Sequence, residues 1–261
     1  MTILTSLDLF SGIGAAAIGF GRAGIKTIAF CEIAPYPRRV LALRWPDVPI
    51  YEDIRKLNAQ RLVDDGIGFA DIIAAGFPCT NISAAGDKTG IHGEQSNLWF
   101  DCLRLIDELR PKFVVVENVA DLRHRGLDTV LRSLVAIGYD AEWHCIPASA
   151  VNAPHQRDRI WIISYPQMLA CDSRCAAQSR DDHPSRRSQE PLGGLRGHAP
   201  AVRRPVLSEL GEQHPWPAES GIHRVSYGLP HVMDRLKCLG NASVPRISEI
   251  IGRAIINSYA V

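Results

Sequence analysis

The chain lacks the features of a membrane or secreted protein. None of its runs approaches the roughly 18 apolar residues that a membrane-spanning helix needs. The first ten residues, MTILTSLDLF, have no basic start and no long apolar stretch, so we expect no signal peptide. The seven cysteines are odd in number and lie mostly in apolar segments, which suits free thiols in a reducing compartment. These features favour a cytoplasmic protein without a membrane partner.

An excess of charge and a metal-ligand spacing are also missing. Lys and Arg number 29 and Asp and Glu 28, so bulk charge identifies no partner. A nucleic-acid-binding protein can still concentrate its positive charge on one face. Cys171 and Cys175 have no second pair at zinc-ribbon spacing, and the His-Gly-Glu tripeptide at 92–94 is not followed by P-C-x-x-C. We therefore expect no metal site.

Most of the chain alternates strand and helix patterns. Strand patterns lie at 2–10, 26–33, 70–79, 112–119, 139–151 and 158–165, and helix patterns at 15–24, 34–45, 97–111 and 126–138. The β-branched run at 112–119 is typical of a strand that is buried on both faces. The alternation predicts an α/β fold with a doubly wound, mostly parallel sheet, whose ligands bind at the carboxyl ends of the strands.

The composition changes near residue 166. Residues 166–225 are rich in Arg, Ser, Gln, Pro and Gly and show no apolar periodicity, which fits either a flexible insertion or a surface whose arginines contact phosphates. Order returns near residue 226, and 243–260 has the pattern of a helix with Ser243 as its N-cap and Pro245 in its first turn. We therefore expect one domain from residues 1–165 and 226–261, with a small irregular region between them.

A glycine turn follows the first strand. Gly12, Gly14 and Ala17 fit the G-x-G-x-x-G/A pattern of a nucleotide-binding turn, although a plain tight turn has the same sequence. Glu32 follows about twenty residues later, where an acid can hold ribose hydroxyls. A nicotinamide site is compatible with this spacing, but the Phe and Ser before Gly12 suit a cofactor that has no pyrophosphate.

A further acid, Asp53, follows the next apolar stretch. It can accept a hydrogen bond from an adenine amino group, with Ile33 and Ile54 packing on the ring. A solvated loop carboxylate is the alternative for each acid taken alone. Ordered placement after successive strands favours a nucleoside site.

Cys79 ends a Gly-Phe-Pro turn after the strand pattern at 70–79. A free cysteine is most often a small buried hydrophobic residue. A cysteine on a loop at the carboxyl end of a strand is more often a working thiol. The local sequence leaves both interpretations open.

Several motifs together resemble the DNA cytosine-C5 methyltransferases, above all the short enzymes of phages and prophages. They are DLFSGIG (8–14), GFPC (76–79), ENV (117–119), RDR (157–159) and GNASVP (240–245), in the order of that family. The resemblance implies a class I S-adenosylmethionine-dependent methyltransferase fold, in which 166–225 is a short target-recognition region. It also implies a monomer that flips a cytosine out of double-stranded DNA in the cytoplasm of a bacterium or phage-infected host, as in restriction-modification systems.

The resemblance also implies a set of catalytic residues. Cys79 would add to cytosine C6, because C5 is a poor nucleophile until such an addition makes the ring enamine-like. Glu117 would protonate or hydrogen-bond N3, and Asn118 would orient the Gly-Phe-Pro-Cys loop. One of Arg157 and Arg159 would polarise O2, and both would help to hold that loop.

The remaining implied residues bind the cofactor or DNA. The cofactor set is Phe10, Gly12, Gly14, Glu32, Ile33, Asp53, Ile54, Pro78, Leu98, Asn241 and Ser243. Ser83 matches a position that contacts a backbone phosphate. Gln95, Asn97 and His155 depart from residues that are common in the family.

Two other functions remain open at this stage. One is cytosine-C5 methylation of tRNA, which uses the same chemistry. The other is a catalytically degenerate relative that binds DNA or the cofactor without turnover, against which the intact Cys79, Glu117 and Arg157 argue. A nicotinamide dehydrogenase would leave the Pro-Cys turn and the Glu-Asn pair unexplained.

Overall fold

The computed structural model describes residues 3–78, 98–167 and 232–259. Its strands are β1 (Thr5–Leu9), β2 (Lys26–Cys31), β3 (Ile50–Tyr51), β4 (Ile72–Ala75), β5 (Phe113–Val119), β6 (Tyr139–Ile146) and β7 (Arg159–Pro166). Its α-helices are α1 (Ala15–Ala23), α2 (Pro35–Arg44), α3 (Ala59–Asp64), α4 (Leu98–Leu109), α5 (Leu122–Arg125), α6 (Leu127–Ala136), α8 (Val232–Asn241) and α9 (Pro245–Tyr259). Two 3₁₀ turns, η1 (Ile54–Lys56) and η3 (Ala148–Val151), complete the described elements.

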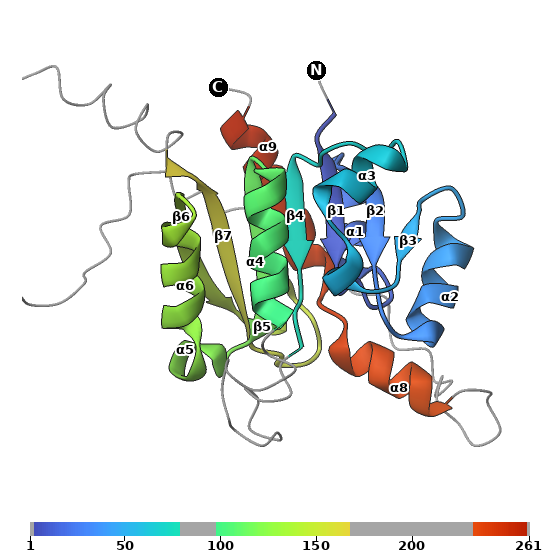
Figure 1. Cartoon of the computed structure of the whole chain (residues 1–261). Helices are drawn as coiled ribbons and strands as arrows, with labels where there is room; N and C mark the ends of the chain where they lie inside the picture. The colour runs from blue at the N-terminus through green and yellow to red at the C-terminus, as the bar shows by residue number, and fades with distance from the viewer. Residues whose placement is uncertain (1–2, 79–97, 168–231, 260–261) are drawn as a thin grey trace, which may run out of the picture.

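The strands form one sheet in the order β3-β2-β1-β4-β5-β7-β6. β1 pairs in parallel with β2 and β4, and β4 pairs in parallel with β5. β7 is antiparallel to both of its neighbours, β5 and β6. The predicted doubly wound, mostly parallel α/β sheet is confirmed, and the carboxyl ends of β1, β2, β4 and β5 meet at one edge (Figure 1).

Helices cover both faces of this sheet (Figure 1). One face packs on α4, α6 and α3, and its core includes Trp99, Ile106 and Val130. The other face packs on α1 and α9, with Phe20 and Ile251 in its core. β5 contributes alternately to both cores, because Val114 and Val116 face the first while Phe113 and Val115 face the second. The β-branched run is therefore buried on both faces, as its sequence predicts.

Glycines allow α1 and α9 to pack very closely. A Cβ added to Gly19 would lie 2.2 Å from the carbonyl oxygen of Pro245. A Cβ added to Gly252 would lie 2.9 Å from the Cβ of Ala23. Real Cβ atoms do not come this close to backbone or to other Cβ atoms, so only glycine fits at these two points of the contact.

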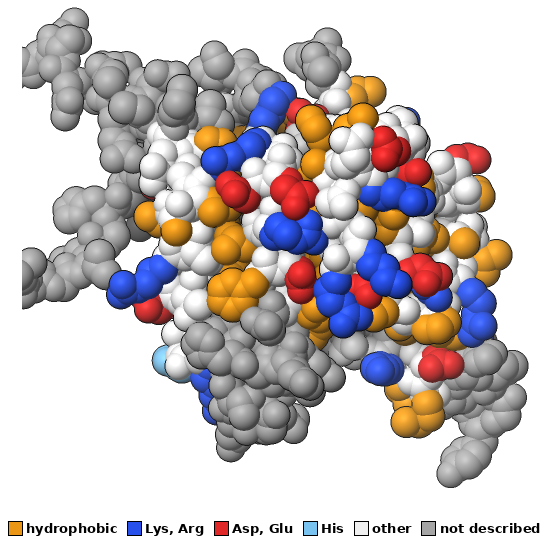
Figure 2. Space-filling view, in the orientation of Figure 1, with side chains coloured by type: hydrophobic (Ala, Val, Ile, Leu, Met, Phe, Trp, Pro, Cys, Tyr) orange, Lys and Arg blue, Asp and Glu red, His pale blue; other side chains and the backbone are white. Residues whose placement is uncertain are grey.

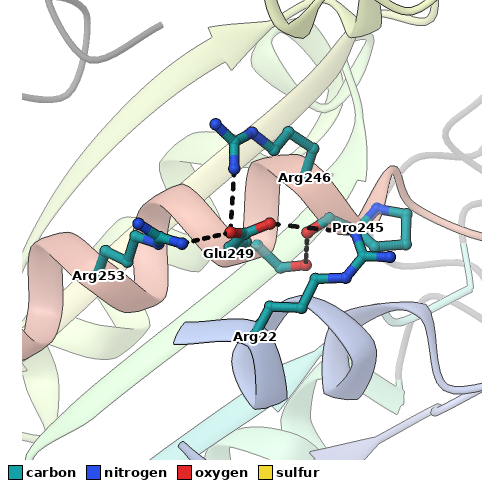
Figure 3. Close-up of polar contacts among 6 residues, drawn as sticks. Arg22, Pro245, Arg246, Glu249 and Arg253 are labelled. Atoms are coloured by element: carbon teal, nitrogen blue, oxygen red, sulfur yellow. Dashed lines mark hydrogen bonds and ion pairs between the residues drawn. The ribbon is translucent and has the colours of Figure 1, made fainter. Parts of the chain in front are cut away.

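A buried carboxylate also joins these helices (Figure 3). Glu249 is 5% exposed and accepts hydrogen bonds from Arg253 at 2.8 Å and from Arg246 at 3.0 Å. Arg22 of α1 lies 4.0 Å from its other oxygen. Because a buried charge is tolerated only when it is paired, these arginines make the junction between α1 and α9 electrostatically possible.

The surface over α3 and α4 carries charges of both signs. Figure 2 shows blue and red side chains interspersed on this face. Several of these side chains form ion pairs. Arg104 lies 2.8 Å from Glu108, and Arg61 lies 2.8 Å from Asp65. A face of alternating charge does not present the single-sign field that attracts a polyanion.

The element boundaries differ from the sequence expectations at several points. The predicted helix 126–138 starts after a separate short helix, α5, and Gly126 lies between the two. The strand pattern 139–151 ends at Ile146 and continues as η3. β3 and α3 were not predicted, because β3 has only two residues and α3 only six.

The last helix begins with Pro245, as expected for proline in a first turn. Val244 then precedes the helix, so the predicted N-cap Ser243 is one position too early. The expected boundaries of the irregular region lie largely in residues outside the described ranges. None of the helices in those ranges is both long and apolar enough to cross a membrane.

Candidate active site

The turn after β1 has an unusual backbone. Phe10, Gly12 and Gly14 all have positive φ angles, of 56°, 52° and 80°. A Cβ on Gly14 would lie 2.5 Å from the ring of Trp45, so this position requires glycine for both its conformation and its space. A Cβ on Gly12 would meet nothing within 4 Å, so the backbone of this turn is open on that side. An open glycine turn before a helix is the arrangement that lets a nucleoside approach the main chain.

Glu32 lies directly against this turn. The N–H of Gly12 donates to Oε2 of Glu32 at 2.8 Å, and the N–H of Ala34 donates to Oε1 at 2.8 Å. Ser11 adds a second link between β1 and β2, because the N–H of Cys31 donates to its Oγ at 3.2 Å. The structure therefore brings the predicted glycine turn and the predicted ribose acid together.

Asp53 follows β3 and is held by its neighbour Arg55. The carboxylate accepts the N–H of Arg55 at 3.0 Å and pairs with its guanidinium at 2.8 Å. This hydrogen bonding lowers the pKa of Asp53. Of the two predicted ring-packing residues, Ile33 is 62% exposed whereas Ile54 is 4% exposed and belongs to the core. Ile33 thus offers an exposed apolar side chain next to Glu32, whereas Ile54 packs in the core with Cys31 and Leu57.

Asp8 is a residue that the sequence reasoning missed. It lies within β1 and is only 3% exposed. Burial, and then the charge of Glu32, raise the pKa of Asp8 well above its ordinary value, although the backbone of Ala17 hydrogen-bonds the carboxylate. Its Oδ2 has no hydrogen-bond partner among the described residues. Its position as an acid within the apolar strand pattern at 2–10 could have indicated that Asp8 is buried.

Glu117 lies near the carboxyl end of β5, next to Arg159 of β7. Arg159 Nε is 2.9 Å from Oε1 of Glu117, an ion pair without hydrogen-bond alignment. The Glu117 side chain is 17% exposed. Burial raises the pKa of Glu117, while the positive charges of Arg159 and Arg157 oppose that rise. A carboxyl shifted toward its neutral form and flanked by cations can donate a proton and stabilise developing negative charge.

The second predicted arginine contacts a different element. Nη2 of Arg157 donates to the carbonyl oxygen of Gly240, in the last turn of α8, at 2.6 Å. Gly240 and Asn241 belong to the GNASVP motif. Arg157 therefore lies between the Glu117 region and the end of α8.

Asn118 holds the strand-to-turn segment that precedes Cys79. Its Nδ2 donates to the carbonyl oxygen of Phe77 at 3.1 Å, and its Oδ1 accepts the N–H of Val119 at 2.8 Å. The ring of Phe77 packs on Trp99, with ring centroids 5.5 Å apart. On the same segment, a Cβ added to Gly76 would lie 3.5 Å from Oε2 of Glu117. The backbone leading to Cys79 thus passes directly beside the carboxyl.

The remaining predicted residues are distributed as follows. Cys79 and Ser83 lie outside the described residues, as do Gln95 and Asn97. Pro78 is half-buried in the turn after β4, and Leu98 is half-buried at the start of α4. Asn241 is exposed at the end of α8, and Ser243 is half-buried between α8 and α9.

The described cysteines are poor nucleophiles. Cys31 and Cys102 are buried, and burial raises the pKa of both thiols, that of Cys31 to about 12. Burial also raises the pKa of Cys145 and Cys238. A thiol attacks as its thiolate, so none of these four is suited to attack at neutral pH. Within the described ranges there is also no group of three acid, His or Cys side chains that could hold a metal ion.

The sequence profile of C-5 cytosine-specific DNA methylases matches residues 4–212. The chain belongs to this family. The type II methyltransferase M.CviJI of Paramecium bursaria Chlorella virus IL3A is 38% identical over 156 residues, which are 59% of this chain and 41% of that protein. M.DsaV of Dactylococcopsis salina is 34% identical over 166 residues, 62% of this methylase-family chain and 46% of the relative.

Solved structures agree with the family assignment. A prophage-encoded protein of E. coli, described as a DNA modification methyltransferase, matches with a TM-score of 0.53 and 26% identity, over 64% of this chain and 48% of that one. S. pombe Dnmt2 methyltransferase matches with a TM-score of 0.52 and 18% identity, over 63% of this chain and 50% of that one, which shows the shared fold. The chain spans about half of the length of the relatives it matches, or less.

Proposed function

We propose that the chain is a DNA cytosine-C5 methyltransferase that acts on a cytosine flipped out of double-stranded DNA. The observation that carries the proposal is the linkage around Glu117. This carboxyl has a raised pKa and two flanking arginines, and the adjacent Asn118 is hydrogen-bonded to the turn that leads to Cys79. Addition to a pyrimidine ring requires a nucleophile that reaches C6 from one face of the ring, with an acid and a cationic group at the edge that carries N3 and O2.

The proposed reaction begins with Cys79. Its thiolate adds to C6 of the cytosine, and negative charge develops on N3 and O2 of the ring. Glu117 donates its proton or a hydrogen bond to N3, and its raised pKa keeps a larger share of the carboxyl protonated than an exposed glutamate would have. Arg159 stabilises the same charge from the side of β7.

The residues on the other half of the edge fit a nucleoside cofactor. The open face of the Gly12 turn, the carboxylate of Glu32 against it and the exposed Ile33 provide backbone, ribose and ring contacts. Phe10 belongs to the same turn as Gly12, Asp53 follows the neighbouring strand β3, and Asn241 is the last residue of α8. S-adenosylmethionine bound there would supply the methyl group. The acids hold the nucleoside, and the turn after β4 lies between it and Glu117.

The covalent step gives the sharpest test. DNA that carries 5-fluorocytosine should form a denaturation-resistant adduct with the wild-type chain, because fluorine at C5 prevents release of the enzyme. Cys79→Ala should abolish the adduct, and Cys145→Ala, which removes a thiol of raised pKa from β6, should retain it. If Cys79→Ala still forms the adduct, the nucleophile is wrong.

The substrate is tested in the same assay. A tRNA that carries 5-fluorocytosine should give no adduct, and an adduct with tRNA alone would overturn the DNA assignment. Bisulfite sequencing of DNA from a methylation-free host that expresses the chain would then give the recognised sequence. Cofactor binding without any methylation in that host would instead indicate a degenerate relative.

A further inference from the structure

Arg157 is bonded to one part of the site and acts electrostatically on another. Its guanidinium donates to the carbonyl oxygen of Gly240, which is 83 residues away in the sequence, at 2.6 Å. Its positive charge also acts on the carboxyl of Glu117, after that of Arg159. Arg157 precedes β7, so it is anchored to the sheet beside β5.

Helix α8, whose last turn contains Gly240, lies over the cofactor half of the edge. Cys238 lies two residues before Gly240. Partial burial and then the negative charge of Glu32 raise the pKa of its thiol. Glu32 in turn is bonded to the open turn at Gly12. The last turn of α8 therefore lies close to the carboxylate proposed to hold the ribose, as its place below β1 and β2 in Figure 1 agrees.

The carbonyl groups of that last turn need partners. The last four carbonyl groups of an α-helix have no N–H donor within the helix, and they form the negative end of the helix dipole. The N–H of Ala242 satisfies the carbonyl of Cys238 at 2.9 Å, and Arg157 satisfies that of Gly240. A charged donor is well suited to this position, because it both fills the hydrogen bond and offsets the dipole.

We propose that Arg157 is a positioning residue that fastens the end of α8 over the cofactor and thereby couples cofactor binding to Glu117. The proposal rests on the proposed function, because it takes Glu32 as a cofactor ligand and Glu117 as the acid. Coupling of this kind is reciprocal: if cofactor binding holds α8 in place, it also holds the Arg157 charge beside Glu117. Arg159 places a positive charge beside Glu117 but is not bonded to α8, since its partners among the described residues are Glu117 and the carbonyl oxygen of Asp158.

Arg157 and Arg159 therefore form a matched pair for an experiment on the full chain. Binding of S-adenosylhomocysteine is measured by calorimetry without DNA, for the wild type, Arg157→Gln and Arg159→Gln. We expect Arg157→Gln to weaken binding roughly tenfold, because a charge-assisted hydrogen bond to the α8 end is lost. Arg159→Gln should change binding by less than about twofold, since the hydrogen bond and ion pair of Arg159 go to Asp158 and Glu117 and not to α8.

The pH dependence separates positioning from a general loss of structure. Among the described residues, the charges acting on Glu117 are those of Arg159 and Arg157. Removing either one should move the alkaline limb of methylation to higher pH, because less positive charge favours the protonated carboxyl. Arg157→Lys keeps the charge and should leave that limb in place, while only partly restoring cofactor affinity.

The outcomes distinguish this inference from the proposed function. If the wild type methylates DNA and Arg157→Gln binds S-adenosylhomocysteine like the wild type, the coupling is wrong and the function stands. Equal weakening by Arg157→Gln and Arg159→Gln also contradicts it. If thermal denaturation shows that Arg157→Gln is not folded, Arg157→Lys and Arg159→Lys are compared instead. The Arg157 variant should again bind S-adenosylhomocysteine more weakly than the Arg159 variant. No methylation and no cofactor binding by the wild type would overturn the function itself.

Discussion

Carboxylates at the two halves of the same sheet edge are held in opposite ways. On the side of β2 and β3, the oxygens of Glu32 and Asp53 are filled by backbone N–H groups and by Arg55. On the side of β5, Glu117 is largely buried beside an arginine that is not aligned to hydrogen-bond it, and its pKa is raised. Under the proposed function, this difference suits the carboxylates of Glu32 and Asp53 to hold a ligand and the carboxyl of Glu117 to carry a proton.

The largest effect should come from removing the proton of Glu117. Glu117→Gln should lower the methylation rate constant by about 10²- to 10⁴-fold, the usual contribution of a general acid. The fall in rate at high pH should also disappear, because it reports loss of the Glu117 proton as the pH rises through its raised pKa. Single-turnover methylation across pH measures both, with the exposed Glu142→Gln on β6 as the control. If the methylation rate of Glu117→Gln still falls at high pH, the titrating group is a residue other than Glu117.

Changing the other side of the comparison should affect binding and not chemistry. Glu32→Gln replaces one carboxylate oxygen by an amide that faces a backbone N–H, because Gly12 and Ala34 both donate to this side chain. We expect S-adenosylhomocysteine affinity to fall by roughly 10- to 100-fold, as when a hydrogen bond to a charged group is lost. At saturating cofactor the rate constant should recover. A rate constant that stays low at saturation would place Glu32 in the chemistry.

Asp8 tests whether burial alone separates the two behaviours. It lies on the cofactor side but, like Glu117, has a raised pKa. In the unfolded state Asp8 loses its proton near its ordinary pKa of about 4, whereas in the folded state it keeps the proton to higher pH. Stability is therefore lost as the pH rises from the unfolded pKa through the raised folded pKa. Asp8→Asn should remove this loss and stabilise the protein by about 1–3 kcal/mol at pH 8. At pH 3 the two proteins should unfold at similar urea concentrations, and a gap of equal size at both pH values would contradict the titration.

The smallest effect should come from Asp53. Its carboxylate already bonds to Arg55, so an adenine amino group finds it partly engaged. Asp53→Asn keeps one acceptor oxygen, and we expect only about a two- to fivefold loss of cofactor affinity. Arg55→Gln is the matched control, because it frees Asp53 and should leave the affinity equal or higher. Loss of affinity in Arg55→Gln would mean that the arginine itself contacts the cofactor.

Much of this edge was predictable from the sequence, for a physical reason. Parallel strands place their carboxyl ends together, so residues that follow successive strands must meet there. Gly12 and Glu32 were predicted in this way, whereas Glu117 and Asn118 came from the resemblance to the methyltransferase family. The hydrogen bond from Asn118 to Phe77 agrees with the expected orientation of the loop. The strand patterns did not specify the reversed direction of β7, although the connection between Ile146 and Arg159 is about as short as a parallel crossover can be.

Contacts between distant segments could not be predicted. The RDR and GNASVP motifs do not predict the hydrogen bond from Arg157 to the carbonyl oxygen of Gly240, because it depends on where α8 lies over the edge of the sheet. The burial of Asp8 depends in the same way on how α1 covers β1. The engagement of Asp53 by Arg55 is local, but the two-residue spacing alone does not distinguish a paired arginine from a solvated one.

The close packing of α1 on α9 has a consequence for biosynthesis. Gly19 and Gly252 mark a contact between the beginning of the fold and residues translated more than two hundred positions later. The helix that leaves the glycine turn therefore lacks one of its packing partners, α9, while most of the chain is still being synthesised. We expect the nascent chain to acquire protease resistance in one late step, after 245–259 leaves the ribosome, rather than gradually from the N-terminus.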